Sequence, residues 1–329
     1  MKKKKQVVII QNVDIGSTKA LSTFITGFVS NLDKKQFKIT GIFSRNLSHP
    51  NNIKIFEMGT QYNKIKDNFK FALKAYNALK NINKKNKVDI IHCFYPNSSL
   101  MVAYLFKRMI NPNVKIIYDV RSPWIENIFQ MKHINKIYEP FLKKSIYYSE
   151  KVLIKEVDEF IFISDGLKDF YLEKFKKIKR YQILPSAVDT KMFHFTKSNL
   201  REKLGISKEE VILGYVGSID KSRELTSFLD LVLPILIEDK RIKIVFIGEG
   251  NFLEDLKNKV KQNKLEKKIL FLGKISHKEI PKCISIFDFG ICHLPNIFAY
   301  ENSFPLKILE YLACDVPVLA SNIKAHREI

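Results

Sequence analysis

Cysteine, glycine and tryptophan are scarce in this sequence, whose 329 residues include 4 Cys, 12 Gly and 1 Trp. The cysteines have no Cys-x-x-Cys spacing, so the sequence indicates neither a zinc site nor a disulfide framework, and we expect a reducing, cytoplasmic compartment. No run of about 18 apolar residues occurs, which argues against a membrane-spanning helix. The short apolar run of residues 7–10 is too brief for a signal peptide and instead predicts a first strand.

Acidic residues are too few to balance the basic ones. The chain has 56 Lys and Arg against 34 Asp and Glu, which gives a formal net charge of +22. Solvated surface lysines, attraction to anionic lipid headgroups and nucleic-acid binding would each explain such a charge. We find no motif that reads nucleic acid, so we expect no nucleic-acid partner.

The segment 63–87 favours the lipid interpretation. Lys66, Lys70 and Lys74 recur every four residues of an expected helix, and apolar residues follow helical spacing on another face. The ordinary alternative is a domain helix whose apolar side packs on a sheet, and both can hold if the lysines meet headgroups. The apolar residues of this pattern are Ile65, Phe69, Leu73, Tyr76 and Leu79.

Strand and helix patterns alternate along the chain, and the strands are apolar throughout, which indicates parallel sheets covered by helices on both faces. We predict two doubly wound, Rossmann-like α/β domains, residues 1–190 and 191–329, that face each other across a cleft, with ligands at the carboxyl ends of the strands. The expected strands are 6–11, 37–43, 89–94, 114–120, 159–164, 211–217, 242–247, 269–272, 289–292 and 316–320. The expected helices are 21–32, 63–87, 100–110, 138–154, 225–237, 252–262 and 278–284.

Polar residues gather where an expected loop, helix and strand meet near the C-terminus. Asn302 and Ser303 are residue types that cap helix N-termini, and Pro305 suits a first helical turn. Lys307 and Glu310 are three residues apart, so both project from the first two turns, where free backbone N–H groups attract phosphate oxygens. The segment therefore predicts an anion site with a carboxylate beside it.

These residues carry a resemblance to a known family. The run Ser303 to Tyr311 (Ser-Phe-Pro-Leu-Lys-Ile-Leu-Glu-Tyr), followed by Val316-Pro317-Val318, resembles the second half of the glutamate-pair motif of family-4 (group 1) retaining glycosyltransferases of the GT-B fold. Asn302 stands where the first glutamate is expected, as in a branch of that family. More sheet and helix usually follow this motif, so the resemblance implies that the last elements of the second domain are missing after Ile329.

The resemblance implies a reaction. Such an enzyme moves a sugar from a nucleotide-diphosphate donor to a hydroxyl with retention of configuration, in cell-surface polysaccharide or glycolipid assembly. It needs no cofactor and no metal, because Arg223 and Lys307 would stabilise the leaving diphosphate, and Glu310 would hold the donor ribose. With the net charge and the lysine-lined segment, we expect a cytoplasmic protein, peripheral on the inner face of the membrane, with a lipid-linked or saccharide acceptor.

The resemblance also assigns further residues to the two substrates. Arg121 and Ser122 would contact the acceptor, although an internal ion pair from Arg121 to Asp119 or Glu126 is an equal alternative for that arginine. The expected donor-binding residues are Gly16, Gly217, Ser218, Gly248, Lys274, Ile275, Asn302, Ser303, Phe304, Pro305 and Leu306.

Two alternatives remain open at this point. A sugar-nucleotide epimerase of the same architecture should show further acidic and histidine residues at the cleft, and we identify no such set. His92 and His293 both end expected strands, but neither has a partner at the spacing of a catalytic triad or a metal pair. A non-catalytic protein that binds membranes or nucleic acid is the second alternative, favoured by the charge.

Overall fold

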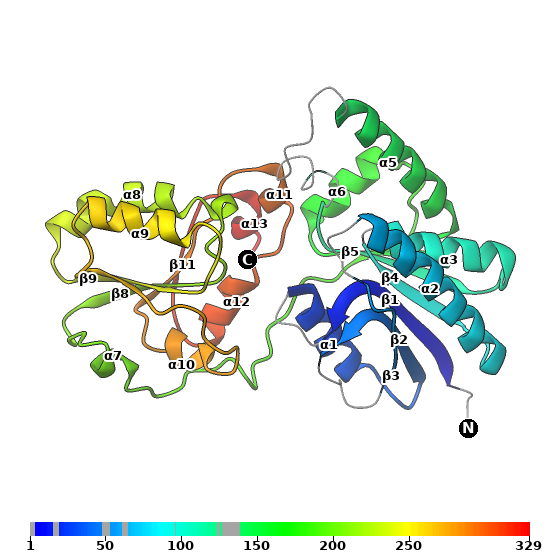
Figure 1. Ribbon diagram of the computed structural model, residues 1–329, viewed down its shortest axis with the longest axis horizontal. Coiled ribbons are helices and arrows are strands. Elements are labelled where there is room, and N and C mark those ends of the chain that lie inside the picture. Colours follow the sequence, from blue (N-terminus) through cyan, green and yellow to red (C-terminus); the bar gives the residue numbers. More distant parts are fainter. Residues whose placement is uncertain are drawn as a thin grey trace. The chain divides into compact units, whose positions relative to one another are not determined.

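The computed structural model describes residues 4–15, 20–47, 53–60, 65–95, 97–123, 126 and 139–329. The chain divides into two compact units, Met1–Ser186 and Ala187–Ile329, so the division falls four residues before the boundary expected from the sequence. Each unit is a parallel sheet with helices packed on it (Figure 1). The expected doubly wound architecture is confirmed for both.

The first unit contains a seven-stranded parallel sheet in the order β3-β2-β1-β4-β5-β6-β7. Its strands are β1 (Lys5–Ile15), β2 (Phe37–Asn46), β3 (Lys54–Glu57), β4 (Ile90–Phe94), β5 (Lys115–Val120), β6 (Glu159–Phe162) and β7 (Tyr181–Ile183). Its helices are α1 (Ala20–Asn31), α2 (Ile65–Lys85), α3 (Asn97–Met109), α5 (Glu139–Leu153), the 3-10 turn η1 (Ile154–Glu156) and α6 (Asp165–Lys174).

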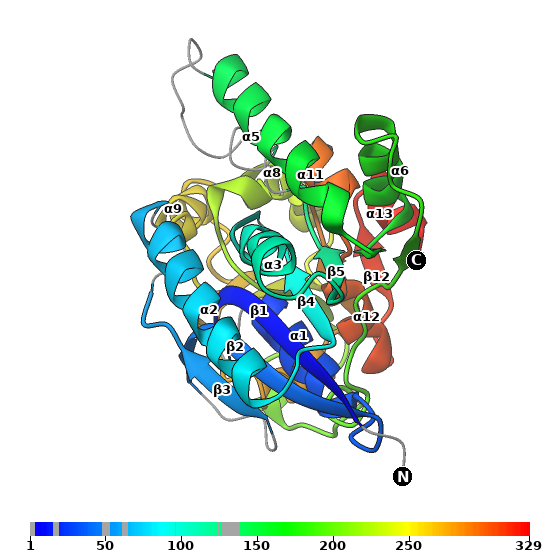
Figure 2. The same cartoon turned by 90° about the vertical axis from the view of Figure 1, so that its right-hand side faces the viewer.

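Helices cover both faces of this sheet. Val7 and Ile9 of β1 are buried in one cluster with Ile25 and Val29 of α1. Because side chains alternate along a strand, the residues between them point to the opposite face. There α2 and α3 pack against each other and against β1 (Figure 2). The result is the three-layer arrangement that nearly continuous apolar strands require.

The second unit contains a five-stranded parallel sheet in the order β10-β9-β8-β11-β12. Its strands are β8 (Val211–Val216), β9 (Ile242–Ile247), β10 (Ile269–Phe271), β11 (Phe289–Cys292) and β12 (Val318–Ala320). Its helices are α7 (Leu200–Lys203), the 3-10 turn η2 (Lys221–Arg223), α8 (Leu225–Glu238), α9 (Leu253–Gln262), α10 (Ile280–Ile284), α11 (Phe298–Glu301), α12 (Leu306–Ala313) and α13 (Lys324–Arg327).

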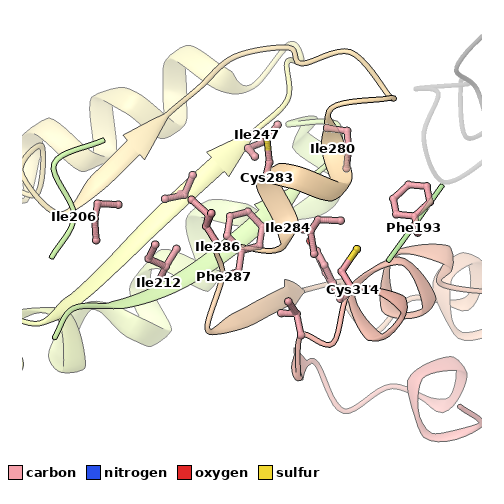
Figure 3. Packing of buried hydrophobic residues seen from close by; sticks show 13 residues of the cluster. Phe193, Ile206, Ile212, Ile247, Ile280, Cys283, Ile284, Ile286, Phe287 and Cys314 are labelled. Atoms are coloured by element: carbon pink, nitrogen blue, oxygen red, sulfur yellow. The ribbon is translucent and has the colours of Figure 1, made fainter. Parts of the chain in front are cut away.

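Alternate residues of β9 separate the core of this unit into two halves. Ile244 and Phe246 pack with residues of α8 and α9 on one face. Val245 and Ile247 pack on the other face with α10 and α12, and Figure 3 shows Ile247 and Cys283 within that second cluster. Helices therefore cover both faces of this sheet, so polar groups are expected at the ends of its strands.

Three elements of the first unit escape the sequence patterns: β3, α6 and β7. β3 and β7 are edge strands of four and three residues, too short to show a period. α6 begins with Ser164 as a true N-cap, because its hydroxyl accepts a hydrogen bond from the Leu167 amide at 3.2 Å. The strand expected at 316–320 is shorter than predicted, since β12 begins at Val318.

The apolar pattern expected for α2 is wrong in part. Phe69 and Leu73 are 62% and 54% exposed, so they lie on the solvent side with the lysines. Leu79 of that pattern is buried, as expected. The helix has apolar residues on more than one side, and those that pack inward include large side chains as well as alanines. The inward-facing residues of α2 are Phe71, Ala72, Ala75, Leu79 and Ile82.

Candidate functional site

Two glycine turns touch at the carboxyl ends of β8 and β9. Gly217 has a φ of +146° and Gly248 a φ of +143°, which side chains with a Cβ rarely adopt. A Cβ on Gly248 would lie 1.8 Å from the carbonyl oxygen of Gly217. The Gly248 amide in turn donates to the carbonyl of Gly273 at 2.8 Å, which joins the end of β10 to the same group. Three strand ends are thereby held together through backbone alone.

Lys307 reaches from α12 across this junction. A Cβ on Gly217 would lie 2.3 Å from the Lys307 Nζ, so the lysine occupies the space that a side chain there would fill. The ammonium also lies 3.9 Å from the centroid of the Tyr215 ring, a cation–π contact. The Tyr215 hydroxyl donates to the Ser218 carbonyl at 2.8 Å and fixes the turn beneath the lysine. A positive charge is therefore positioned at the end of β8.

Arg223 is the second cation at these strand ends. It closes η2, and its guanidinium carbon lies 5.1 Å from the centroid of the Tyr300 ring. Its Nε is buried and finds no acceptor in the described part of the chain. Burial raises the pKa of the Cys292 thiol at the end of β11, while the charges of Lys307 and Arg223 oppose that rise. Both cations therefore act on the Cys292 thiol, and the Arg223 Nε still has a hydrogen to donate.

Glu310 projects from the next turn of α12. Burial raises the pKa of Glu310 from its ordinary value of 4.5 to about 7, and the nearby charge of Lys307 opposes the rise. In the part of the chain that the structure describes, this carboxyl makes no hydrogen bond or ion pair. Glu310 is half-buried, and a carboxyl in this environment without a donor among the described residues is typical of a site that a ligand completes.

Tyr311 fixes the helix that carries both charged residues. Its hydroxyl accepts a hydrogen bond from the Val216 amide at 3.0 Å and donates to the Ile291 carbonyl at 3.3 Å. One phenol thus ties α12 to β8 and β11. Tyr215, Tyr300 and Tyr311 are functional neighbours that the sequence patterns did not single out, because a tyrosine between apolar residues looks like any other core residue.

The capping roles expected for Asn302 and Ser303 are wrong. The short helix α11 precedes them, and both turn back to it: Asn302 Nδ2 donates to the Phe298 carbonyl and Ser303 Oγ to the Tyr300 carbonyl, each at 2.8 Å. Pro305 is the N-cap of α12 and makes no side-chain cap. The Leu306 amide donates to the Phe304 carbonyl at 3.1 Å, so the first turn is partly satisfied from within.

The other expected donor residues lie at the same strand ends or outside the described residues. Ser218 directly follows Gly217 in the turn after β8. Lys274 is exposed after β10, and Ile275 packs its side chain into the core. Gly16 lies outside the described residues, so its expected role stays a prediction.

Arg121 lies at the carboxyl end of β5 in the first unit. Its Nε donates to Asp119 Oδ1 at 2.9 Å, which confirms the internal ion pair with Asp119. The guanidinium also stacks 3.4 Å from the Phe24 ring, and His92 Nε2 lies 3.2 Å from Asp119 Oδ2. Arg121 Nη1 is nevertheless buried and has no acceptor among the described residues. Ser122 is the next residue and is half-buried.

Neither a metal-binding cluster nor a membrane-spanning helix occurs among the described residues. Nowhere in these segments do three His, Cys, Asp or Glu side chains come together in a way that could hold a metal ion. No described helix is both long and apolar enough to cross a membrane.

The unpaired carboxyl predicts a stability change. The folded chain keeps the Glu310 proton up to about pH 7, whereas an unfolded chain releases it near 4.5, so the free energy of unfolding falls as pH rises between these values. We expect Glu310→Gln to raise the free energy of unfolding by about 1–3 kcal/mol at about pH 8 and by little at about pH 5. Denaturant unfolding at both pH values measures this.

The matched control is Glu238→Gln, which changes an exposed glutamate at the end of α8. A Glu310→Gln variant that is less stable than the parent at about pH 8 would contradict the burial argument.

Comparison with protein families finds two matches that together span most of the chain. The model of glycosyltransferase family 4 fits residues 21–192, and the model of glycosyl transferases group 1 fits residues 196–329. Solved structures share the fold: sucrose-phosphate synthase from Thermosynechococcus elongatus has a TM-score of 0.75 at 17% identity, covering 97% of this chain and 82% of that one. Anabaena HepE, solved with UDP and glucose, has a TM-score of 0.72 at 12% identity, covering 98% and 82%.

Curated relatives are similar in sequence. N-acetyl-alpha-D-glucosaminyl L-malate synthase of Bacillus anthracis is 24% identical over 75% of this chain and 60% of its own length. Alpha-monoglucosyldiacylglycerol synthase of Streptococcus pneumoniae is 23% identical over 76% of this chain and 56% of its own length. The chain thus spans less than two thirds of these relatives. Because the family model that fits residues 21–192 covers more than half of the sequence, the chain belongs to glycosyltransferase family 4.

Proposed function

We propose that the protein transfers a sugar from a nucleotide-diphosphate donor to a hydroxyl group, with retention of the anomeric configuration. The observation that carries the proposal is the placement of Lys307 and Arg223 at the ends of β8 and β11, with the unpaired carboxyl of Glu310 on the same helix as Lys307. Two cations with free donors suit a diphosphate, and a carboxylate suits the hydroxyls of a ribose.

Lys307 and Arg223 would act on the reaction electrostatically. As the bond between sugar and phosphate breaks, negative charge grows on the diphosphate, and donors fixed in advance lower the barrier. The contacts of Lys307 with Tyr215, and of Arg223 with Tyr300, keep both side chains in place before the donor arrives. In this proposal the departing phosphate oxygen takes the acceptor proton, so no enzymic nucleophile and no metal is needed.

The comparisons support a nucleotide sugar as the donor. The Anabaena HepE structures hold UDP and UDP-glucose. Glu310 is assigned to the ribose hydroxyls, which donate to a carboxylate. The backbone at Lys274 and Ile275 would contact the base, because the preceding Gly273 is hydrogen-bonded to the glycine junction.

Arg121 is assigned to an anionic group of the acceptor. Asp119 and Phe24 fix the guanidinium in one orientation, and the buried Nη1 retains a donor that no described residue uses. A buried donor without a partner costs about 1–3 kcal/mol, which a phosphate or carboxylate of the acceptor would offset. Ser122 follows it and would add a hydroxyl contact.

The acceptor class follows from the relatives and from α2. One relative is a synthase named for a glucosyldiacylglycerol, and another, from Escherichia coli, is named for O-antigen biosynthesis. On α2 the exposed Phe69 and Leu73 lie beside exposed Lys70 and Lys74. Apolar side chains among lysines suit an anionic membrane surface. We therefore propose a lipid-linked or saccharide acceptor used at the cytoplasmic face of a membrane, where the four free cysteines would stay reduced.

Removing the ribose contact should weaken donor binding. We expect Glu310→Gln to reduce the affinity for UDP by about 1.5–3 kcal/mol, because a charge-assisted hydrogen bond is lost. Titration calorimetry on the folded variant measures this, beside a melting assay in which UDP at about 100 times its dissociation constant adds about 2.7 kcal/mol to the parent. Unchanged affinity would remove Glu310 from the donor site.

Removing both cations should affect turnover more than binding. We expect Arg223→Ala with Lys307→Ala to lower kcat by at least about a hundred-fold, with a smaller loss of UDP affinity, because the diphosphate gains charge in the transition state. Product formation from UDP-sugars at saturating donor measures kcat. The control is Lys221→Ala with Lys267→Ala, two exposed lysines of the same unit. Equal turnover in both double variants would refute the assignment.

The membrane surface assigned to α2 is tested by sedimentation with vesicles. We expect the parent to bind anionic vesicles, to release them as salt rises and to ignore neutral ones, because screening shortens the attraction to about 8 Å at physiological salt. Phe69→Ser with Leu73→Ser should weaken this binding. Leu231→Ser with Ile235→Ser, an exposed pair at the same spacing on α8, serves as the control. Equal loss in both pairs would contradict the role of α2.

A further inference from the structure

A cavity of ≈ 690 Å³ opens at the amino edge of the first sheet, opposite to the edge that carries Arg121. It lies where β1, β2 and β3 begin and where α1 and α2 end, so the strand ends assigned to substrates do not line it. Its volume falls within the range of about 300–1,000 Å³ that is typical of pockets for small molecules.

The inner wall of this cavity is apolar. Val29 and Ile39 are buried side chains that line it from the α1 side of the sheet, Ile82 is buried and lines it from α2, and Phe56 is half-buried. Two polar side chains in the wall are satisfied by each other, because Gln6 Nε2 donates to Thr40 Oγ1 at 2.9 Å. The buried part of the wall therefore offers contact area to a hydrocarbon, while the exposed Asn81 and Asn86 add polar groups at its edge.

The rim has the opposite character. Six lysines line the cavity and no acidic residue does: Lys4, Lys34, Lys38, Lys54, Lys84 and Lys85. All six are exposed, and none of them forms an ion pair within the described residues. Lys38 and Lys54 come from neighbouring strands, on which Gln6 pairs with Lys38 and Thr40 with Lys54. Their charges repel one another, and only Lys4 has an electrostatic contact with an acidic residue, Asp33, among the described residues.

We infer that this cavity binds an anionic amphiphile, with the acyl chain against the apolar wall and the acidic head among the lysines. An acyl chain gains affinity from each methylene that it buries, and an acidic head gains affinity from each nearby lysine. Neither a neutral lipid nor a short anion gains both contributions. The inference does not depend on the transferase assignment, because none of the lining residues belongs to the donor or acceptor site.

The test uses the full chain and dodecyl phosphate below its critical micelle concentration, with binding followed by calorimetry. Dodecyl maltoside supplies the same chain without the charge, and inorganic phosphate supplies the charge without the chain. We expect dodecyl phosphate to bind and both comparison compounds to bind at least about ten-fold more weakly. A second arm with phosphatidylglycerol vesicles shows whether the chain also takes the amphiphile from a membrane.

Two variants locate the binding. Lys38→Glu with Lys54→Glu is expected to weaken dodecyl phosphate binding by about ten-fold or more, because two attractive charges become repulsive. Lys144→Glu with Lys151→Glu changes the net charge equally on the exposed side of α5 and should leave binding unchanged. Phe69→Ser with Leu73→Ser, which tests the outer face of α2, should also leave it unchanged. Thermal unfolding confirms that each variant folds.

Several results would overturn the inference. The first is an equal loss of dodecyl phosphate binding in the two lysine-pair variants. The second is binding of dodecyl maltoside as tight as that of dodecyl phosphate. The third is no binding of dodecyl phosphate together with no effect of the Lys38 and Lys54 changes on vesicle binding. Binding of monomeric dodecyl phosphate that depends on Lys38 and Lys54 supports a free amphiphile as the ligand. Vesicle binding alone, with the same dependence, supports a membrane lipid.

Discussion

The contact between the Gly217 carbonyl and the Gly248 turn is the constraint on which the candidate site depends. A Cβ on Gly248 would meet the Gly217 carbonyl and force the ends of β8 and β9 apart. A Cβ on Gly217 would instead meet the Lys307 side chain, whose ammonium contacts the Tyr215 ring. The Tyr311 hydroxyl then fixes α12 to the same sheet, so the charged residues of that helix are held in fixed positions relative to the strand ends.

This part of the unit carries unfavourable energy. Burial of Glu310 and the unfilled donor on Arg223 both cost stability in the free chain. The surrounding apolar clusters compensate, since both faces of the sheet are sealed and the helices pack on alternate residues of β9. Arg121 repeats the pattern in the first unit, where Asp119 and Phe24 hold a guanidinium that still has a spare donor. Polar groups left unpaired at strand ends are what a substrate would complete.

Much of the fold could be predicted from the sequence, because long apolar strands and amphipathic helices have clear periods. The strands 242–247 and 289–292 were predicted with their observed bounds. Short edge strands such as β3 could not be, since four residues show no period. The exposed Phe69 shows a second limit: a helix with apolar residues on two sides does not reveal which side packs.

The candidate site was predictable where charge and position are set by one helix, as for Lys307 and Glu310. It was not predictable where side chains choose between local and tertiary partners. Asn302 and Ser303 have the chemistry of caps, but their side chains donate to carbonyls of α11, and α12 has no side-chain cap. An acceptor contact and an internal ion pair were equal alternatives for Arg121; the structure shows the ion pair with Asp119, and the acceptor contact stays a proposal.

Because Lys307 fills the space above Gly217, the two positions constrain each other in evolution and in protein design. The two positions are far apart in the sequence and belong to different elements, yet a larger residue at the first would evict the side chain of the second. Neither can be varied on its own without moving the charge at the strand end. Anyone who recombines segments of related chains, or redesigns the turn after β8, should therefore exchange that turn and α12 together as a single module.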